Sequence, residues 1–172
     1  SVGNNIKNNI MICSAGRHYK IVKNIKSTVG EGVVVVTTNN STVPAPYCAD
    51  FAYKICNITA PQYIDVLLSI CKKHDINGIM SMLDEEAEIL AQNREKFNAL
   101  GVMVFAPNVE SAKICFDKQY MHDYLVKNNI NTILTCDNLE DFDNLLRNGK
   151  ISFPVFIKPK SGCGSVGAEK ID

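Results

Sequence analysis

The stretch Asn9-Ile10-Met11-Ile12-Cys13 is a short apolar run, and the polar turn Ser14-Ala15-Gly16-Arg17 closes it. An uninterrupted apolar run of this length, bounded by a turn, is typical of a strand with both faces buried. Apolar residues then recur at helical spacing from Tyr19 to Ser27, and Gly30 ends that helix. The opening of the chain therefore predicts a strand–turn–helix unit of an α/β fold.

The same alternation continues as far as Phe105. One helix is expected to begin at Pro61. A second is expected to begin at Asp84, which can cap it, and to run to about Leu100. Strands that alternate with helices over short links form parallel sheets with helices on both faces. We therefore predict a Rossmann-like, doubly wound domain over residues 1–110. Its further strands are expected at 33–36, near 54–56, at 79–82 and at 102–105.

A different pattern follows from residue 111. A short helical piece reaches Cys115, and Asp117 is then expected to cap a helix that runs through Asn128. Residues 111–172 are too few to enclose a hydrophobic core by themselves. We predict that residues 111–172 begin a second, α+β domain and that the chain is a piece of a longer protein. The remaining elements are expected as a strand at 131–134, a helix at 139–147 and a hairpin of strands at 153–158 and 166–171.

The composition restricts the classes of function. Eighteen basic residues balance eighteen acidic ones, so the chain lacks the cationic surplus that nucleic acids and anionic membranes attract. The longest aliphatic run, Val33–Val36, is far shorter than the roughly 18 residues of a membrane span. The seven cysteines form no Cys-x-x-Cys pair, and Ser1–Lys7 has no apolar signal segment. We expect a cytoplasmic protein with free thiols, no zinc site, and no nucleic-acid or membrane partner.

The segment Phe153–Gly167 contains the most chemical information. An apolar strand delivers Lys158 to a loop rich in glycine and serine. Glycines let backbone N–H groups approach an anion, and a lysine adds a point charge for phosphate oxygens. The loop lacks the Gly-Lys-Ser/Thr of a Walker A motif, and Ser14–Arg17 has too few glycines for a dinucleotide fingerprint. On composition alone, a hairpin turn and a phosphate cradle fit this loop equally well.

Four groups of residues, in order, resemble the ATP-grasp superfamily, and most closely its carbamoyl-phosphate-synthase-like members. The first group closes the family's pre-ATP-grasp domain, and the others resemble the start, a link and the phosphate flap of the ATP-grasp fold. The groups are Met82–Glu88 with Asn93–Phe97 and Gly101-Val102, then Asp117-Lys118, then Val126–Ile130, and finally Phe153–Pro159 with the loop that follows.

The resemblance implies an ATP-dependent ligase. Such enzymes use ATP and Mg²⁺ to convert a carboxylate or bicarbonate to an acyl phosphate, which an amine or ammonia then attacks. Lys118 and Lys158 match the family's lysines that contact the ATP phosphates. The family's mobile loop over the phosphates is matched by Ser161, Gly162, Gly164, Ser165 and Gly167.

The resemblance also limits what residues 1–172 are expected to do. The family keeps its Mg²⁺ ligands and its catalytic arginine in a second ATP-grasp subdomain that these residues do not contain. We therefore assign no metal ligand and no catalytic residue, and we expect these residues alone to be inactive. Homo-oligomeric assembly stays open. The alternative is a non-catalytic α/β regulatory or scaffold module with a vestigial nucleotide site.

Three further features have both a structural and a functional interpretation. The acidic cluster at 84–88 can hold a metal or a substrate amine, but complementing a helix N-terminus is the favoured interpretation. Arg17 follows the first strand, where it either binds a carboxylate or phosphate in an interdomain cleft or lies on the surface. Cys163 is either redox-sensitive or, as favoured, only a small loop residue.

Overall fold

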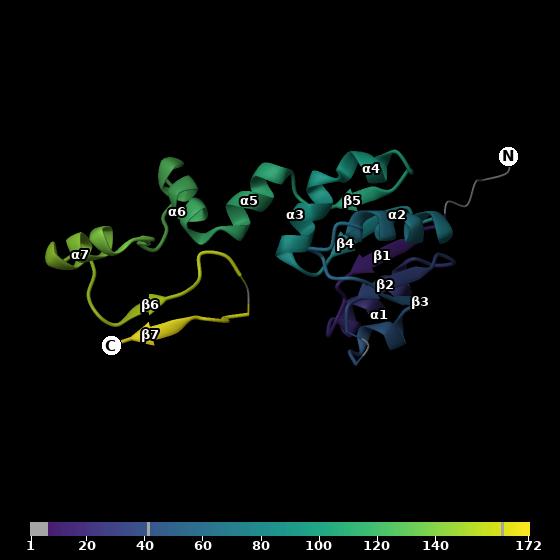
Figure 1. Ribbon diagram of the computed structural model, residues 1–172, viewed down its shortest axis with the longest axis horizontal. Coiled ribbons are helices and arrows are strands. Elements are labelled where there is room, and N and C mark those ends of the chain that lie inside the picture. Colours follow the sequence, from purple (N-terminus) through teal and green to yellow (C-terminus); the bar gives the residue numbers. More distant parts are fainter. Residues whose placement is uncertain (1–6, 41, 163) are drawn as a thin grey trace. The chain divides into compact units, whose positions relative to one another are not determined.

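The structure is a computed structural model that describes residues 7–40, 42–162 and 164–172. The chain divides into two compact units, Ser1–Val109 and Glu110–Asp172 (Figure 1). Within the described residues, no helix combines the length and the apolar character that crossing a membrane requires.

The first unit is built on a five-stranded sheet in which every neighbouring pair of strands is parallel. The strand order is β3-β2-β1-β4-β5, so β1 lies at the centre. This topology confirms the predicted α/β fold class, with β1 and the helix after it close to their expected bounds. The strands are β1 (Ile10–Cys13), β2 (Val34–Thr38), β3 (Phe51–Lys54), β4 (Gly78–Ser81) and β5 (Met103–Phe105).

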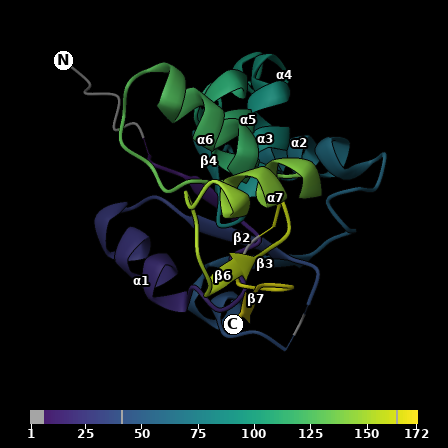
Figure 2. The same cartoon turned by 90° about the vertical axis from the view of Figure 1, so that its left-hand side faces the viewer.

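Helices cover both faces of this sheet. Helix α1 lies on one face, and α2, α3 and α4 lie on the other (Figures 1 and 2). Alternate residues of β1 explain the two layers, because Ile12 packs into one apolar cluster while Met11 and Cys13 pack into the other. The helical elements are α1 (Tyr19–Thr28), the 3-10 helix η1 (Ala45–Cys48), α2 (Tyr63–Lys73), α3 (Asp84–Gln92) and α4 (Arg94–Asn98).

Details of the first unit differ from the sequence prediction, and the strand expected near 54–56 lies at Phe51–Lys54. The single helix expected from Asp84 to about Leu100 is two helices, and the Asn93 side chain donates to the Ile89 carbonyl where α3 ends. A side-chain amide that bonds the backbone in this way competes with the continuing helix. Asp84 is the first residue of α3 rather than its cap, because Leu83 occupies the cap position without a side-chain bond.

The second unit contains three helices and a hairpin. Asp117 caps α6 as predicted, accepting hydrogen bonds from the backbone N–H groups of Gln119 and Tyr120 at 2.9 Å each. Strands β6 and β7 pair antiparallel, which confirms the predicted hairpin. The elements are α5 (Val109–Phe116), α6 (Lys118–Lys127), α7 (Leu139–Arg147), β6 (Val155–Ile157) and β7 (Glu169–Ile171).

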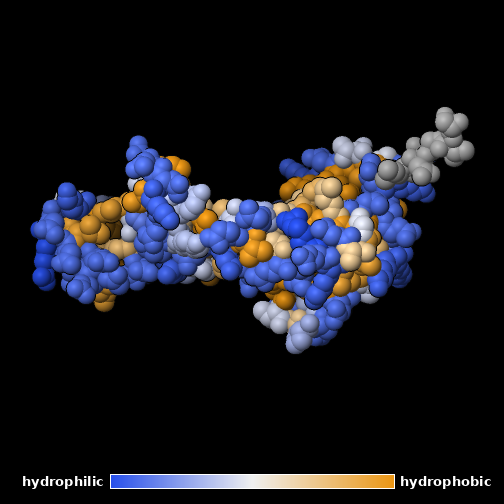
Figure 3. Space-filling view, turned by 90° about the horizontal axis from the view of Figure 1, so that it is seen from above, coloured by the Kyte–Doolittle hydropathy of each residue, from blue (hydrophilic) through white to orange (hydrophobic). Residues whose placement is uncertain are grey.

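The strand predicted at 131–134 is wrong. This segment forms no regular element, and Ile133 is 73% exposed. A strand needs a neighbour to bond its backbone, and none of the described strands pairs with this segment. Apolar side chains are widely exposed in this unit, as Figure 3 shows at the left of the view, and no described residue from Asp117 onward is buried.

One buried side chain fixes where the central strand begins. The Asn9 amide nitrogen donates to the carbonyl oxygens of His74 at 2.9 Å and Asp75 at 3.1 Å. Its amide oxygen accepts from the Val33 N–H at 3.1 Å. Asn9 therefore ties β1 both to the start of β2 and to the connection before β4, with all the polar atoms of its side chain used.

We predict that Asn9→Asp destabilises the first unit by roughly 3 kcal/mol, because a carboxylate oxygen would then face two carbonyl oxygens in a buried position. Urea unfolding followed by circular dichroism measures the change. Asn8→Asp is the matched control at an exposed neighbour and should change the free energy of unfolding by less than about 0.5 kcal/mol. Equal stability of the two variants would contradict this role of Asn9.

Candidate functional site

A cleft of about 440 Å³ opens at the carboxyl edge of the parallel sheet in the first unit. Segments that follow β1, β2, β3 and β4 all contribute to it, because parallel strands end at the same edge. Concave sites of this size at this edge are the usual ligand sites of open α/β sheets. The lining residues are Ser14, Gly16, Arg17, Thr38, Asn39, Asn40, Val43, Asn57, Ile58, Thr59, Leu83 and Glu85.

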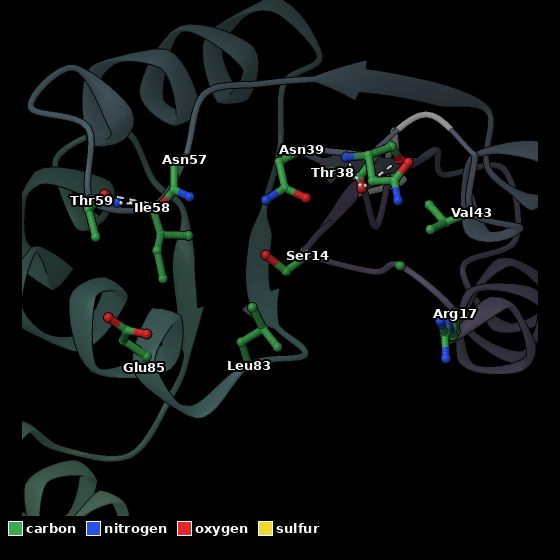
Figure 4. Close-up of a pocket in the computed structure, with 12 residues that line it drawn as sticks. Ser14, Arg17, Thr38, Asn39, Val43, Asn57, Ile58, Thr59, Leu83 and Glu85 are labelled. Carbon is green, nitrogen blue, oxygen red and sulfur yellow. Dashed lines mark hydrogen bonds between the residues drawn. The ribbon is translucent and has the colours of Figure 1, made fainter. Parts of the chain in front are cut away.

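The cleft presents opposite charges on its two sides. Figure 4 shows Arg17 on one side, Glu85 on the other, and Ser14 and Asn39 between them. The structure thus places Arg17 in the cleft of the first unit, where the sequence left its role open. A ligand here meets a cation, an anion and uncharged hydrogen-bonding groups, which suits a small polar molecule better than an apolar one.

Ser14 occupies a strained position at the end of β1. Its φ is +48°, in the left-handed region that residues with a side chain rarely adopt. The turn is held by backbone bonds, since the Ala15 N–H donates to the Thr37 carbonyl at 3.3 Å and the Gly16 carbonyl accepts from the Ala45 N–H at 3.1 Å. These bonds offset the cost of the strained residue and leave the Ser14 side chain lining the cleft.

The acidic cluster divides into residues with different environments. Asp84, Glu85 and Glu86 all lie in the first turn of α3, as the favoured helix interpretation requires. Glu85 lines the cleft, whereas Glu86 is fully buried and accepts hydrogen bonds from the hydroxyl groups of Tyr63 and Ser81. Burial raises the pKa of Glu86 to about 7, against a smaller lowering by a hydrogen bond from Ser14.

The burial of the Glu86 carboxyl was not predicted from the sequence. The helical spacing could have indicated this burial. Glu86 lies four residues before the buried Leu90 and is therefore on the same face of α3. A carboxyl on the apolar face of a helix needs hydrogen-bonding partners, which α2 and β4 supply here.

The second unit carries the predicted nucleotide-binding residues. The Lys118 ammonium donates to the carbonyl oxygens of Gly162 at 3.1 Å and Lys160 at 3.4 Å, so the structure brings Lys118 and the loop together. Lys158 is exposed, and among the described residues it has no hydrogen-bond or ion-pair partner. Cys163 lies outside the described residues.

The loop is open at its glycines. Gly162, Gly164 and Gly167 all have positive φ, and a Cβ at Gly162 or Gly164 would meet nothing within 4 Å. Ser161 and Ser165 are both exposed. An exposed loop of glycines and serines next to two lysines fits a polyphosphate, since bare backbone groups and cations are what such a ligand needs.

Lys160, for which no role was predicted, anchors the loop. Its ammonium lies 2.9 Å from an Asp137 carboxylate oxygen and 3.9 Å from one of Asp117. The hydrogen bond from Lys160 lowers the pKa of Asp137. Within 7–40, 42–162 and 164–172, no group of three His, Cys, Asp or Glu side chains is placed to hold a metal ion.

A protein-family model matches the segment of the chain that spans the whole sheet of the first unit. The model of the PylC-like N-terminal domain matches residues 10–105, more than half of the chain. The chain belongs to the PylC-like N-terminal domain family.

Individual relatives of this PylC-like chain are ligases and carboxylases. A phosphoribosylamine–glycine ligase from Methanocella arvoryzae is 25% identical over 95 residues, which are 55% of this chain and 22% of that protein. The N5-carboxyaminoimidazole synthetase of Staphylococcus aureus, solved with ADP, superposes with a TM-score of 0.72 at 15% identity, over 96% of this chain and 41% of that one.

A third relative was solved with a nucleotide and a metal. The biotin carboxylase domain of Hydrogenobacter thermophilus 2-oxoglutarate carboxylase, in complex with MgADP, ADP and bicarbonate, has a TM-score of 0.66 at 19% identity, over 95% of this chain and 37% of that one. At these identities the likeness establishes the fold. The predicted membership of the ATP-grasp superfamily is confirmed, while the carbamoyl-phosphate-synthase-like subdivision stays a prediction.

We predict that Glu86→Gln removes a pH dependence of stability. Because the folded pKa of about 7 lies above the ordinary 4.5, the folded state keeps a proton that the unfolded state loses between these values. The stability from Glu86 is therefore fully present below pH 4.5 and falls as the pH rises to 7, by up to about 3 kcal/mol.

Urea unfolding of wild type and Glu86→Gln at several pH values measures this difference. Glu88→Gln is the matched control, because it makes the same change on the same helix at a position that is only partly buried. Curves for wild type and Glu86→Gln that run parallel from pH 4.5 to 7 would show that Glu86 has an ordinary pKa in the folded protein.

Proposed function

We propose that this chain is the N-terminal part of an ATP-grasp ligase of carbamoyl-phosphate-synthase-like type. The enzyme uses ATP and Mg²⁺ to phosphorylate a small carboxylate or bicarbonate, and an amine or ammonia then displaces the phosphate. The observation that supports this most is the combination of a PylC-like N-terminal domain with a fold shared, over nearly the whole chain, with enzymes solved with ADP or MgADP.

In this proposal the second unit holds the nucleotide phosphates. Lys158 and Lys118 neutralise charge on the phosphates, and the loop of Ser161, Gly162, Gly164, Ser165 and Gly167 covers them. The phosphate oxygens replace the loop carbonyl oxygens that now accept from the Lys118 ammonium. Because the same lysine bonds the loop or the nucleotide, nucleotide binding changes how the loop is held.

The cleft of the first unit holds the small-molecule substrate in this proposal. Arg17 and Glu85 supply opposite charges at its two sides, and Asn39 supplies an amide that has no hydrogen-bond partner among the described residues. A carboxylate is bound by the Arg17 guanidinium, whose N–H groups match its geometry.

We place the catalytic residues and the Mg²⁺ ligands of the enzyme outside residues 1–172. The chain spans about two fifths of the solved chains it resembles and 22% of the glycine ligase, so most of each relative has no counterpart here. The exposed apolar side chains of the second unit, such as Val126 and Phe156, support a further part of the fold packing there. The six described cysteines are free thiols, which suits a cytoplasmic location.

We predict that Mg-ATP raises the midpoint of thermal unfolding of the full-length protein, because a ligand that binds the folded state stabilises it. Lys158→Ala should weaken Mg-ATP binding about tenfold or more, since it removes a charge-assisted contact to phosphate. Isothermal titration calorimetry measures the affinity. Lys150→Ala is the control, as it removes an exposed lysine of the same unit outside the loop.

Two results would remove this proposal. If Mg-ATP does not shift the unfolding midpoint of the wild type, the protein is the non-catalytic module. If Lys158→Ala and Lys150→Ala bind Mg-ATP as the wild type does, the loop after β6 is a structural turn.

A further inference from the structure

The two edges of the five-stranded sheet are protected differently, and the β5 edge is closed. Because the Met103 N–H bonds toward β4, the backbone groups of Val104 point outward. The outward carbonyl of Val104 accepts from the Arg94 guanidinium at 2.7 Å. The same guanidinium donates to the carbonyl oxygens of Ala106 at 2.6 Å and Pro107 at 2.9 Å. Arg94 of α4 thus blocks the pairing of another strand at this edge.

The β3 edge, at the other end of the sheet, is open. The Ile55 N–H donates to the Thr38 carbonyl of β2 at 2.9 Å. Because alternate residues of a strand face the same neighbour, the backbone groups of Ala52 and Lys54 point away from β2. Among the described residues, none bonds to these outward groups. Both residues are exposed, so β3 presents free donors and acceptors to a further strand.

The aromatic side chains of this edge are held in fixed positions. Nε2 of His74 lies 2.6 Å from the Tyr53 hydroxyl, and the ring centroids of His74 and Phe51 are 4.3 Å apart. The Lys73 ammonium lies 5.3 Å from the centroid of the Tyr53 ring. Phe51 is nevertheless 45% exposed. An exposed aromatic side chain that is already held in place loses little conformational entropy when a partner covers it.

The sequence of this edge is complementary to itself in the antiparallel direction. It reads Asp50-Phe51-Ala52-Tyr53-Lys54. When two copies pair with Ala52 opposite Ala52, Phe51 falls opposite Tyr53 of the second copy, and Asp50 falls opposite Lys54 of the second copy. The pairs are aromatic against aromatic on one face and acid against base on the other, which are favourable cross-strand pairs. The outward groups of the two Ala52 residues exchange hydrogen bonds at the symmetry axis.

The charges at this edge also suit a second copy of the chain. A lysine on an edge strand usually discourages pairing, but this register gives Lys54 an acidic partner. Lys54 has no ion-pair partner among the described residues. The Asp50 carboxylate pairs with Lys26 at 2.7 Å and accepts from the Val34 N–H at 2.9 Å, while its side chain stays 30% exposed. Since a carboxylate has about four acceptor positions, Asp50 can accept from a further lysine.

We propose that the protein forms a symmetric dimer in which the β3 edges of two copies pair antiparallel about Ala52. The interface is isologous, because the same residues serve both copies, and it joins two five-stranded sheets into one. One short strand from each copy buries less surface than a stable dimer needs, so the dissociation constant is on the order of 10–100 μM. This inference goes beyond the proposed function, since it uses no residue of the second unit.

Analytical ultracentrifugation of the full-length protein, from about 1 to 500 μM, tests this association. We expect the mass to rise from that of a monomer toward that of a dimer. Lys54→Glu places a carboxylate opposite Asp50 and should weaken dimerisation about tenfold or more. Lys96→Glu is the matched control, because it makes the same charge change at an exposed position of α4, and it should dimerise as the wild type does.

Two variants of Ala52 test the register. Ala52→Pro removes the outward N–H but no hydrogen bond within the sheet, so it should weaken dimerisation while unfolding near the wild-type temperature. Ala52→Cys places two thiols opposite each other at the axis, within reach of a disulfide. With oxidised glutathione as the oxidant, it should form a disulfide between the two residues 52, identified by mass spectrometry of the linked peptides. Lys96→Cys is the control and should form none.

A protein that stays monomeric over the whole concentration range overturns the proposal. It is also overturned if Lys54→Glu or Ala52→Pro dimerises as the wild type does, or if Ala52→Cys cross-links no more than Lys96→Cys. These results do not affect the binding of Mg-ATP, which the proposed function assigns to the second unit. Failure here is therefore distinguishable from failure of the proposed function.

Discussion

The parallel register of the central strand with its two neighbours is the constraint on which the first unit depends. β1 pairs with β2 and β4. The Asn9 side chain, just before β1, bonds to Val33 at the start of β2 and to His74 in the connection before β4. Because both faces of β1 are buried, a shift by one residue would move Ile12 into the wrong apolar cluster. The register in turn brings the ends of four strands to one edge, where the cleft opens.

A second consequence of this register is a polar network behind the cleft. Burying a carboxylate is unfavourable unless hydrogen bonds compensate, and Glu86 obtains them from Tyr63 and Ser81. The cost that remains appears as the raised pKa of Glu86. In the second unit the polar contacts are exposed instead, between Lys118, Lys160 and the loop. The first unit thus supplies a preformed cleft, and the second supplies an open loop.

Sequence reasoning worked where local patterns decide the structure. The apolar run before Ser14 and the leucine-rich helix at 139–147 lie where the sequence predicts them, and Asp117 caps its helix. It failed at 131–134, because an apolar segment becomes a strand only beside another strand. The partners of Glu86 were also beyond prediction, because Tyr63 and Ser81 are separated from each other in sequence and meet only through the fold. The roles of Lys118 and Lys158 come from the family resemblance and stay proposals.

We propose that the loop after β6 holds the phosphates of a nucleotide. Hydrogen–deuterium exchange of the full-length protein, with and without Mg²⁺ and a non-hydrolysable ATP analogue, tests it most directly, because it reports each backbone N–H group. We expect slower exchange over residues 158–168 when the nucleotide is bound. Unchanged exchange in this segment, with protection confined to other parts of the protein, would contradict it.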